Sequence, residues 1–166
     1  MEWISTERRS ELLAATTTSV WKLELLDRYG IDLAYSDDPG EVERVMSSAV
    51  TETAAWAAAG IEQRRIKTIS EPASKYMRGA FVFASHLVGA GEDIRWLPRR
   101  LASTLFLPGN DMFLIDDAFA MFNVHDGDSN PAGQQRENDP RLVKRCKEAF
   151  EAAWTVAVPH RDYRPV

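Results

Sequence analysis

A glycine-containing turn near residue 90 is followed by a short run of charged and aromatic residues. Guanidinium groups bind carboxylates and phosphates through paired hydrogen bonds, and ligands of open α/β sheets collect where strands end. We therefore expect Arg95, Trp96 and Arg99 to bind a small anionic ligand, with Glu92 as a candidate catalytic carboxylate. The alternative is an ion-pair network that only holds the turn.

A second polar group surrounds Pro72, where a strand is expected to end and a helix to begin. Helix N-termini attract anions because their first N–H groups are unpaired. Tyr76 and Arg78 are therefore candidate ligand-binding residues, and Glu71 is a candidate general base. The alternative is that Ser74 is an ordinary helix cap and that Glu71 only compensates the helix dipole.

Three aspartates, Asp111, Asp116 and Asp117, lie close together further along the chain. Carboxylate oxygens bind divalent metals, but aspartate is also a preferred turn former, and adjacent strand residues point to opposite faces. We expect a hairpin turn here and no metal site, and we keep Asp116 as a third candidate catalytic carboxylate. No cofactor is expected.

The sequence completes no recognised catalytic motif. It contains neither a glycine-rich phosphate-binding loop nor a G-x-S-x-G nucleophile motif. The single cysteine, Cys146, excludes an internal disulfide and falls on an apolar helix stripe, which is typical of an inert buried thiol.

Composition limits the class of protein. The 166 residues are 45% hydrophobic and carry a formal net charge of −5. This length suits a single domain, which we expect to span residues 1–166. No apolar run approaches the roughly 18 residues that cross a bilayer, and no secretory segment is present, so we expect a cytoplasmic protein without membrane contact. The acidic balance argues against direct nucleic-acid binding, despite a local patch at Arg95, Arg99 and Arg100.

Hydrophobic periodicity and turn residues predict the elements that must position these groups. The expected helices cover residues 2–15, 40–59, 74–88 and 139–156. The expected strands cover residues 20–25, 64–69, 93–97, 112–115 and 118–124. Residues 36–39 read as a helix start, residues 101–107 as a short helix or irregular cover, and residues 125–138 as a surface loop.

This order predicts an α/β fold with a single-layer mixed sheet of about five strands covered by helices. The hairpin at 112–124 must be antiparallel, and strands separated by helices suggest parallel neighbours. Trp96 is expected to be half exposed. Lys22 and Glu24 are expected on a wet strand face.

Four blocks of sequence together carry a family resemblance. They read SEPASKYMR at 70–78, AGEDIRWLPR at 90–99, LPGNDMFLIDD at 107–117 and AVPHRDYRP at 157–165. These blocks resemble an actinobacterial family of uncharacterised domains that are often encoded beside small helix-turn-helix regulators. The chain departs from the usual family pattern at Gly79-Ala80 and at Met112-Phe113.

A weaker similarity, at the level of the fold, is to one half of a phospholipase-D-like domain. Those enzymes need a His-x-Lys pair, with histidine as the nucleophile. None of the three histidines here is followed by lysine two positions later, so no phosphodiesterase activity of that type is expected.

These observations lead to a preferred hypothesis and alternatives. The family resemblance implies a non-catalytic regulatory or interaction domain that senses a small anionic ligand or modulates a helix-turn-helix partner; a homodimer is compatible with the sequence. The alternative is a small enzyme of specialised metabolism with a carboxylate/arginine site at the strand ends. Its residues would be Glu71, Tyr76, Arg78, Glu92, Arg95 and Asp116. Nucleic-acid binding is the weakest alternative.

Overall fold

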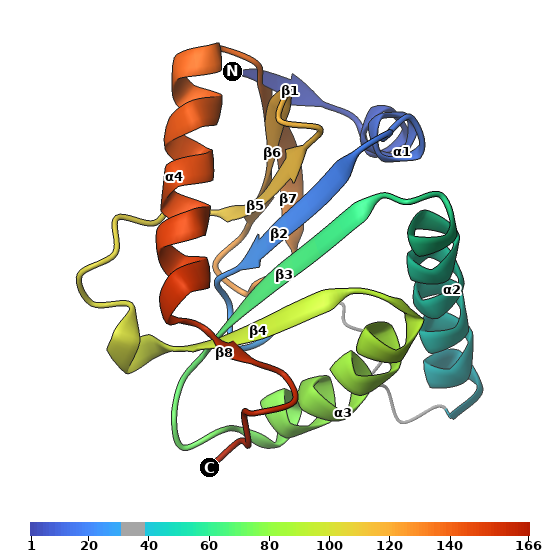
Figure 1. Cartoon of the computed structure of the whole chain (residues 1–166), viewed down its shortest axis with the longest axis vertical. Coiled ribbons are helices and arrows are strands. Elements are labelled where there is room, and N and C mark those ends of the chain that lie inside the picture. Colours follow the sequence, from blue (N-terminus) through green and yellow to red (C-terminus); the bar gives the residue numbers. More distant parts are fainter. Residues whose placement is uncertain (31–38) are drawn as a thin grey trace.

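An eight-stranded sheet with helices on both faces forms the centre of the computed structural model, which describes residues 1–30 and 39–166 (Figure 1). The strands are β1 (Glu2–Ile4), β2 (Ser19–Glu24), β3 (Glu62–Ile69), β4 (Asp93–Pro98), β5 (Asp111–Ile115), β6 (Phe119–His125), β7 (Pro131–Glu137) and β8 (Val158–Pro159). Their order across the sheet is β1-β7-β6-β5-β2-β3-β4-β8. Strands β2, β3 and β4 are parallel, and the other pairs are antiparallel, so the sheet is mixed as expected.

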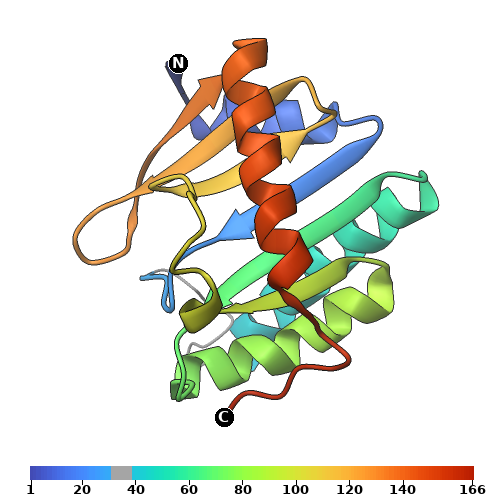
Figure 2. The ribbon, with the colours of Figure 1, turned by 60° about the vertical axis from the view of Figure 1, so that its left-hand side comes forward.

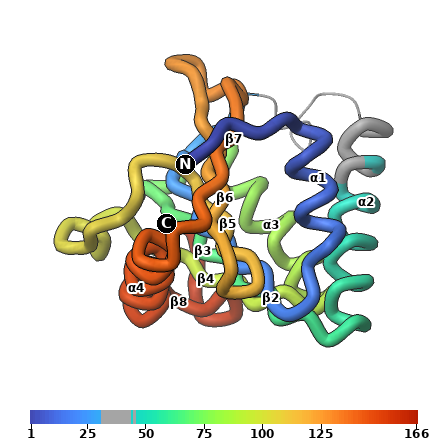
Figure 3. The backbone as a smooth tube through the Cα atoms, turned by 90° about the horizontal axis from the view of Figure 1, so that it is seen from above, coloured from blue at the N-terminus to red at the C-terminus, as the bar shows by residue number. Residues whose placement is uncertain are grey.

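The helices divide between the two faces of the sheet. They are α1 (Thr6–Ala14), α2 (Pro39–Ala58), α3 (Lys75–Ala90) and α4 (Pro140–Val156). Seen from above, α1, α2 and α3 lie on one side and α4 lies on the other (Figure 3). Figure 2 shows α4 running across the strands of the sheet. Within the described residues, no helix is long and apolar enough to cross a bilayer.

The sheet has eight strands and not about five, because hydrophobic periodicity did not predict β1, β7 and β8. The expected helix at 2–15 begins only at Thr6, after the Ser5 side chain accepts a hydrogen bond from Arg8 N, and residues 2–4 instead pair with β7. Strand β7 lies in the segment expected to be a loop. Its side chains are mostly polar, but its backbone pairs with β6 on one side and β1 on the other. Strand β8 is too short to show any period.

Capping and turn chemistry explain the elements that were expected. Helix α3 begins where Ser74 accepts a hydrogen bond from Met77 N, and it ends at Gly91, which has a φ of 115°. The hairpin between β5 and β6 turns at Asp116 and Asp117, both with a φ of 54°, and Ala118 N donates to Ile115 O at 2.9 Å, as in a type I′ turn. Helix α4 begins at the Asp139 cap. The start signal expected for α2 at 36–38 lies outside the described residues.

The alternation of side chains along the central strands divides the core. Leu23, Ile66 and Leu97 point to the α4 face and pack against Phe150, all fully buried. The intervening residues point to the opposite face, where part of the surface is apolar and part is charged. Trp96 belongs to this second face and is 0% exposed, so the expected half-exposed position is wrong. Helices cover both sides of a parallel region, which leaves no wet face in the middle of the sheet.

Candidate functional site

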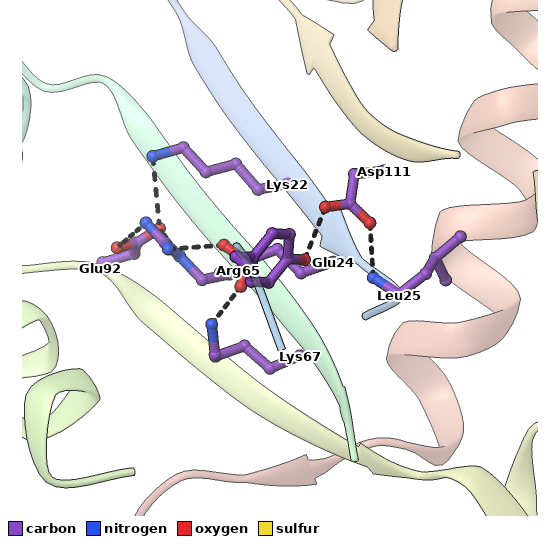
Figure 4. A network of polar contacts seen from close by, with 8 residues as sticks. Lys22, Glu24, Leu25, Arg65, Lys67, Glu92 and Asp111 are labelled. Carbon is purple, nitrogen blue, oxygen red and sulfur yellow. Dashed lines mark hydrogen bonds and ion pairs between the residues drawn. The ribbon is translucent and has the colours of Figure 1, made fainter. Parts of the chain in front are cut away.

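A row of charged side chains crosses the α3-covered face of the sheet (Figure 4). Strand β2 supplies Lys22 and Glu24, and the neighbouring strand β3 supplies Arg65 and Lys67. The parallel register sets Lys22 beside Arg65 and Glu24 beside Lys67. Glu92 joins the row from the turn between α3 and β4 and is 2% exposed.

Ion pairs connect these five residues into a chain, which we call the charge row. Arg65 is central: its Nη1 donates to Glu24 Oε1 at 2.7 Å, and its Nε and Nη2 donate to the two Glu92 oxygens at 2.9 and 3.1 Å. Lys67 Nζ donates to the other Glu24 oxygen. Lys22 Nζ lies 4.0 Å from Glu92 Oε1. The order is therefore Lys22, Glu92, Arg65, Glu24, Lys67, with three cations and two carboxylates.

Burial and charge pairing set the protonation states of the charge row. Burial opposes ionisation of Glu24, but Lys67 and Arg65 outweigh it and lower the Glu24 pKa to about 2. Burial also opposes ionisation of Glu92, and Arg65 together with Lys22 outweighs it, so the Glu92 pKa is lowered. Lys22 behaves differently, because burial, reinforced by Arg65, lowers its pKa to about 8. Both carboxylates are therefore charged at neutral pH, and Lys22 is partly neutral.

A second polar pair lies beside the charge row. Asp111 accepts hydrogen bonds from Leu25 N at 2.7 Å and from the Tyr29 hydroxyl at 2.6 Å. Burial outweighs these bonds and raises the Asp111 pKa. The Tyr29 pKa is also raised, by burial and by the nearby carboxylates Glu24 and Asp111. The Tyr29 ring meets His125 edge to face, with the ring centroids 5.4 Å apart.

A cavity of about 230 Å³ lies between this part of the sheet and α3. Its polar lining includes Lys22, Glu24, Arg65, Lys67, Asp111 and His125. Apolar side chains of α3, among them Phe83 and Leu87, form the opposite wall. A cavity of roughly 150 Å³ accepts benzene, so this one is large enough for a small organic molecule. A small charged or zwitterionic compound suits its lining best.

Comparison with known protein families identifies the chain. The family model described as Domain of unknown function (DUF6879) matches residues 7–165. The chain belongs to this family. The match agrees with the resemblance to an uncharacterised family that the sequence blocks suggested. A search of curated proteins finds no match.

The expected common rim of Glu92, Arg95 and Arg99 does not exist in this DUF6879 domain. Glu92 precedes β4 and Arg99 follows it, so a strand of six residues, roughly 20 Å long, separates them. Arg95 points to the other face, where its Nη1 donates to Trp154 O at 3.0 Å. Trp96 points toward α3 and donates from Nε1 to His160 Nδ1 at 3.0 Å.

Two of the expected residues, Arg99 and Glu71, lie at the carboxyl ends of β3 and β4 but bind different partners. Arg99 donates to Ser70 Oγ at 3.0 Å and to Asp27 Oδ2 at 3.0 Å. Glu71, next to Ser70, accepts from Arg100 at 2.9 Å and from the Tyr163 hydroxyl at 3.1 Å. These contacts tie the ends of the strands to the C-terminal segment.

The other expected residues lie elsewhere. Arg78 donates to Pro165 O at 3.3 Å near the C-terminus, and half-buried Tyr76 packs on the core beneath α3. Asp116 accepts hydrogen bonds from the backbone N–H groups of residues 17–19, the shortest at 2.8 Å. Partial burial opposes ionisation of Asp116, but these hydrogen bonds outweigh it and lower its pKa. Asp116 thus holds the loop before β2 in place.

The charge row was not predicted, because Lys22 and Glu24 were expected on a solvated strand face. A signal was nevertheless present. The expected order put helices on both sides of the parallel strands, which covers both faces. Charged residues at alternate positions of two such strands are then buried, and they must form ion pairs inside the protein.

A serine–histidine pair was also missed. His160 Nε2 lies 3.0 Å from Ser85 Oγ, and its ring stacks on Phe81 with the centroids 4.4 Å apart. Because Nδ1 accepts the Trp96 N–H, the neutral ring carries its proton on Nε2 and donates to Ser85. His160 in this tautomer cannot take a proton from Ser85, so the pair is a structural contact. Among the described residues, no cluster of three or more His, Cys, Asp or Glu side chains is arranged to hold a metal.

Proposed function

We propose that this domain is a non-catalytic regulatory module that senses a small anionic ligand in the cavity beside the charge row. The single observation that carries the proposal is the set of cations that line the cavity. Lys22, Arg65 and Lys67 belong to a row with only two carboxylates, and burial strengthens their attraction for an added anion. The lining adds one further carboxyl group, Asp111, and burial raises its pKa, which opposes a negative charge there.

Of the two cations that donate hydrogen bonds within the row, Lys67 is the better placed to contact the ligand. It uses one of its three N–H donors on Glu24, and it lines the cavity. Arg65 also lines the cavity, but it is held on both sides by Glu24 and Glu92. A carboxylate or phosphate oxygen near Lys67 would complete the alternation of charges along the row.

The proposed partner is a helix-turn-helix regulator, as the family resemblance implies for an actinobacterial cytoplasmic protein. Trp96 gives no support for an interaction surface, since it is buried and not half exposed as expected. Support comes instead from Phe106, which is 97% exposed in the segment between β4 and β5. This segment projects beside α4 (Figure 1). Exposed aromatic side chains are enriched at protein interfaces.

Anion binding is tested by calorimetric titration with sodium malonate and, separately, sodium phosphate. We expect Lys67→Met to weaken binding about tenfold or more, as the loss of one charged hydrogen bond costs about 1.5–3 kcal/mol. The matched control is Lys144→Met, an exposed lysine on the opposite face that should bind as the wild type does. Absence of binding to either anion, or equal weakening in both variants, would overturn the proposal.

The partner is tested by co-expression with a helix-turn-helix regulator encoded beside the gene, followed by co-purification. We expect Phe106→Asp to abolish the complex without changing thermal stability. Full retention of the complex in this variant would place the interface elsewhere, and absence of any complex would remove the partner.

The enzyme alternative has less support. Its proposed residues lie at both ends of the sheet and on both faces, with Glu71 at the carboxyl ends, Glu92 at the opposite end and Arg95 beneath α4.

A further inference from the structure

Lys22 differs from the other two cations of the charge row. Arg65 and Lys67 donate hydrogen bonds to carboxylates, whereas Lys22 Nζ makes no hydrogen bond within the described part of the chain and only a 4.0 Å ion pair with Glu92. Its Nζ lies over two aromatic rings, 5.2 Å from the Trp56 centroid and 5.6 Å from the Phe113 centroid. The side chain is 12% exposed and lines the cavity.

We propose that Lys22 is a nucleophilic amine that captures a small carbonyl acid, such as an aldehyde acid or a 2-oxo acid, as a reversible imine in this cavity. The inference rests on the proposed anion site, because the cations of the charge row would attract the acid group while Lys22 bonds to the carbonyl carbon. It requires no cofactor or oxidant.

The covalent step balances with the two reactants alone. Neutral Lys22 Nζ adds through its lone pair to the carbonyl carbon, and one amine proton passes to the carbonyl oxygen, which becomes a hydroxyl. The nitrogen then forms its second bond to that carbon while the hydroxyl leaves with the second amine proton as water, so amine plus carbonyl gives imine plus water. Hydrolysis reverses the step, which suits a sensor.

The surroundings of Lys22 favour the neutral amine that this step needs. Burial, reinforced by the charge of Arg65, disfavours the ammonium group and lowers the Lys22 pKa to about 8. About one Lys22 side chain in ten is then neutral near pH 7, against roughly one in 2,500 for a lysine of ordinary pKa. Lysines that form imines with carbonyl substrates are commonly activated by burial in this way.

The neighbour of Lys22 in the charge row suits a small bifunctional molecule. Arg65 lies one strand across from Lys22, directly beside it in the register, and it also lines the cavity, whereas Lys67 lies at the far end of the row. The Cα atoms of Lys22 and Arg65 are therefore roughly 5 Å apart, with both side chains on one face. Arg65 is thus the cation nearest to the acid group of a molecule that carries its carbonyl and acid groups on adjacent carbons.

Reductive trapping tests the imine. The full-length protein is incubated near neutral pH with glyoxylate and cyanoborohydride, and adducts are mapped by mass spectrometry after cleavage by a protease that does not act at lysine. The exposed Lys75 and Lys144 are internal controls, and the N-terminal amine is resolved on its own peptide. We expect Lys22 to be modified about tenfold or more faster than Lys75 and Lys144, and excess malonate to slow only the Lys22 adduct.

Equal modification of Lys22 and the exposed lysines, or no adduct at Lys22, overturns the imine. Lys22→Arg keeps the positive charge, so we expect it to bind malonate but to lose the fast adduct. If wild-type protein binds malonate and Lys22 is not trapped by glyoxylate, only the imine is wrong. If malonate does not bind but Lys22 is still trapped rapidly, only the anion site is wrong.

Discussion

Buried arginines have different partners on the two faces of the central strands. Beneath α4, Arg95 lies over the Trp154 ring at 4.1 Å and donates to the Trp154 backbone oxygen, with no carboxylate partner within the described residues. Beneath α3, Arg65 is held between two carboxylates beside a cavity. Packing therefore explains Arg95 on the first face, whereas the second face keeps charged groups next to a cavity. The α3 face is therefore the one suited to bind a ligand.

The largest effect is expected from breaking the charge row at its most buried carboxylate. Glu92→Ala leaves Arg65 without its bidentate partner and Lys22 without its ion pair, so we expect a loss of about 3–5 kcal/mol in the free energy of unfolding. Urea denaturation measures it. Glu148→Ala is the matched control, because its pair with Lys144 is exposed and should contribute under about 1 kcal/mol. Similar losses in the two variants would mean that burial of the row adds nothing.

Replacing Lys22 is expected to raise the free energy of unfolding and not to lower it. Lowering a lysine pKa from 10.5 to about 8 means that its charge costs stability at neutral pH, by about 3 kcal/mol at most. Lys22→Met removes that cost but also the weak contacts of Nζ with Trp56 and Phe113, so we expect a gain of about 1–2 kcal/mol near pH 7. The gain should shrink as pH rises through the folded pKa toward that of the unfolded chain. A destabilised variant would show that Lys22 is retained for stability and not for a ligand.

A smaller effect is expected on the α4 face. Arg95→Met keeps most of the packing volume and loses one hydrogen bond and one cation–π contact. We expect a loss of about 1–2 kcal/mol in the free energy of unfolding, with malonate affinity unchanged. Calorimetric titration alongside urea denaturation checks both parts. A change in malonate affinity would contradict the separation of the two faces.

Local features of the chain could be predicted from the sequence more readily than contacts between strands. Apolar stripes, the Ser74 and Asp139 caps and the Asp116-Asp117 turn act locally, so they could be read from the chain. The charge row could not be read in the same way, because Lys22, Arg65 and Glu92 are joined only by strand register and by a helix that covers them. Strand β7 was missed for a related reason: its polar residues gain their strand conformation from neighbours on both sides.

The smallest effect concerns pH and the C-terminal segment at the far edge of the α3 face. Burial, with Arg164 nearby, lowers the His160 pKa, and neutral Nδ1 accepts the Trp96 N–H. Protonation of Nδ1 would make two N–H donors face each other. The contribution of His160 to the free energy of unfolding is therefore complete above its unfolded pKa of about 6.5 and declines as pH falls below that value.

His160→Phe retains the stacking on Phe81 but has no proton to bind. We therefore expect the stability difference between wild type and His160→Phe to fall by about 1 kcal/mol between neutral and mildly acidic pH, as one hydrogen bond is lost. Thermal denaturation of both proteins across that range measures it. Because the carboxylates of the charge row titrate alike in the two proteins, their contribution cancels, and a difference that does not vary with pH would show that His160 holds the C-terminal segment by stacking alone.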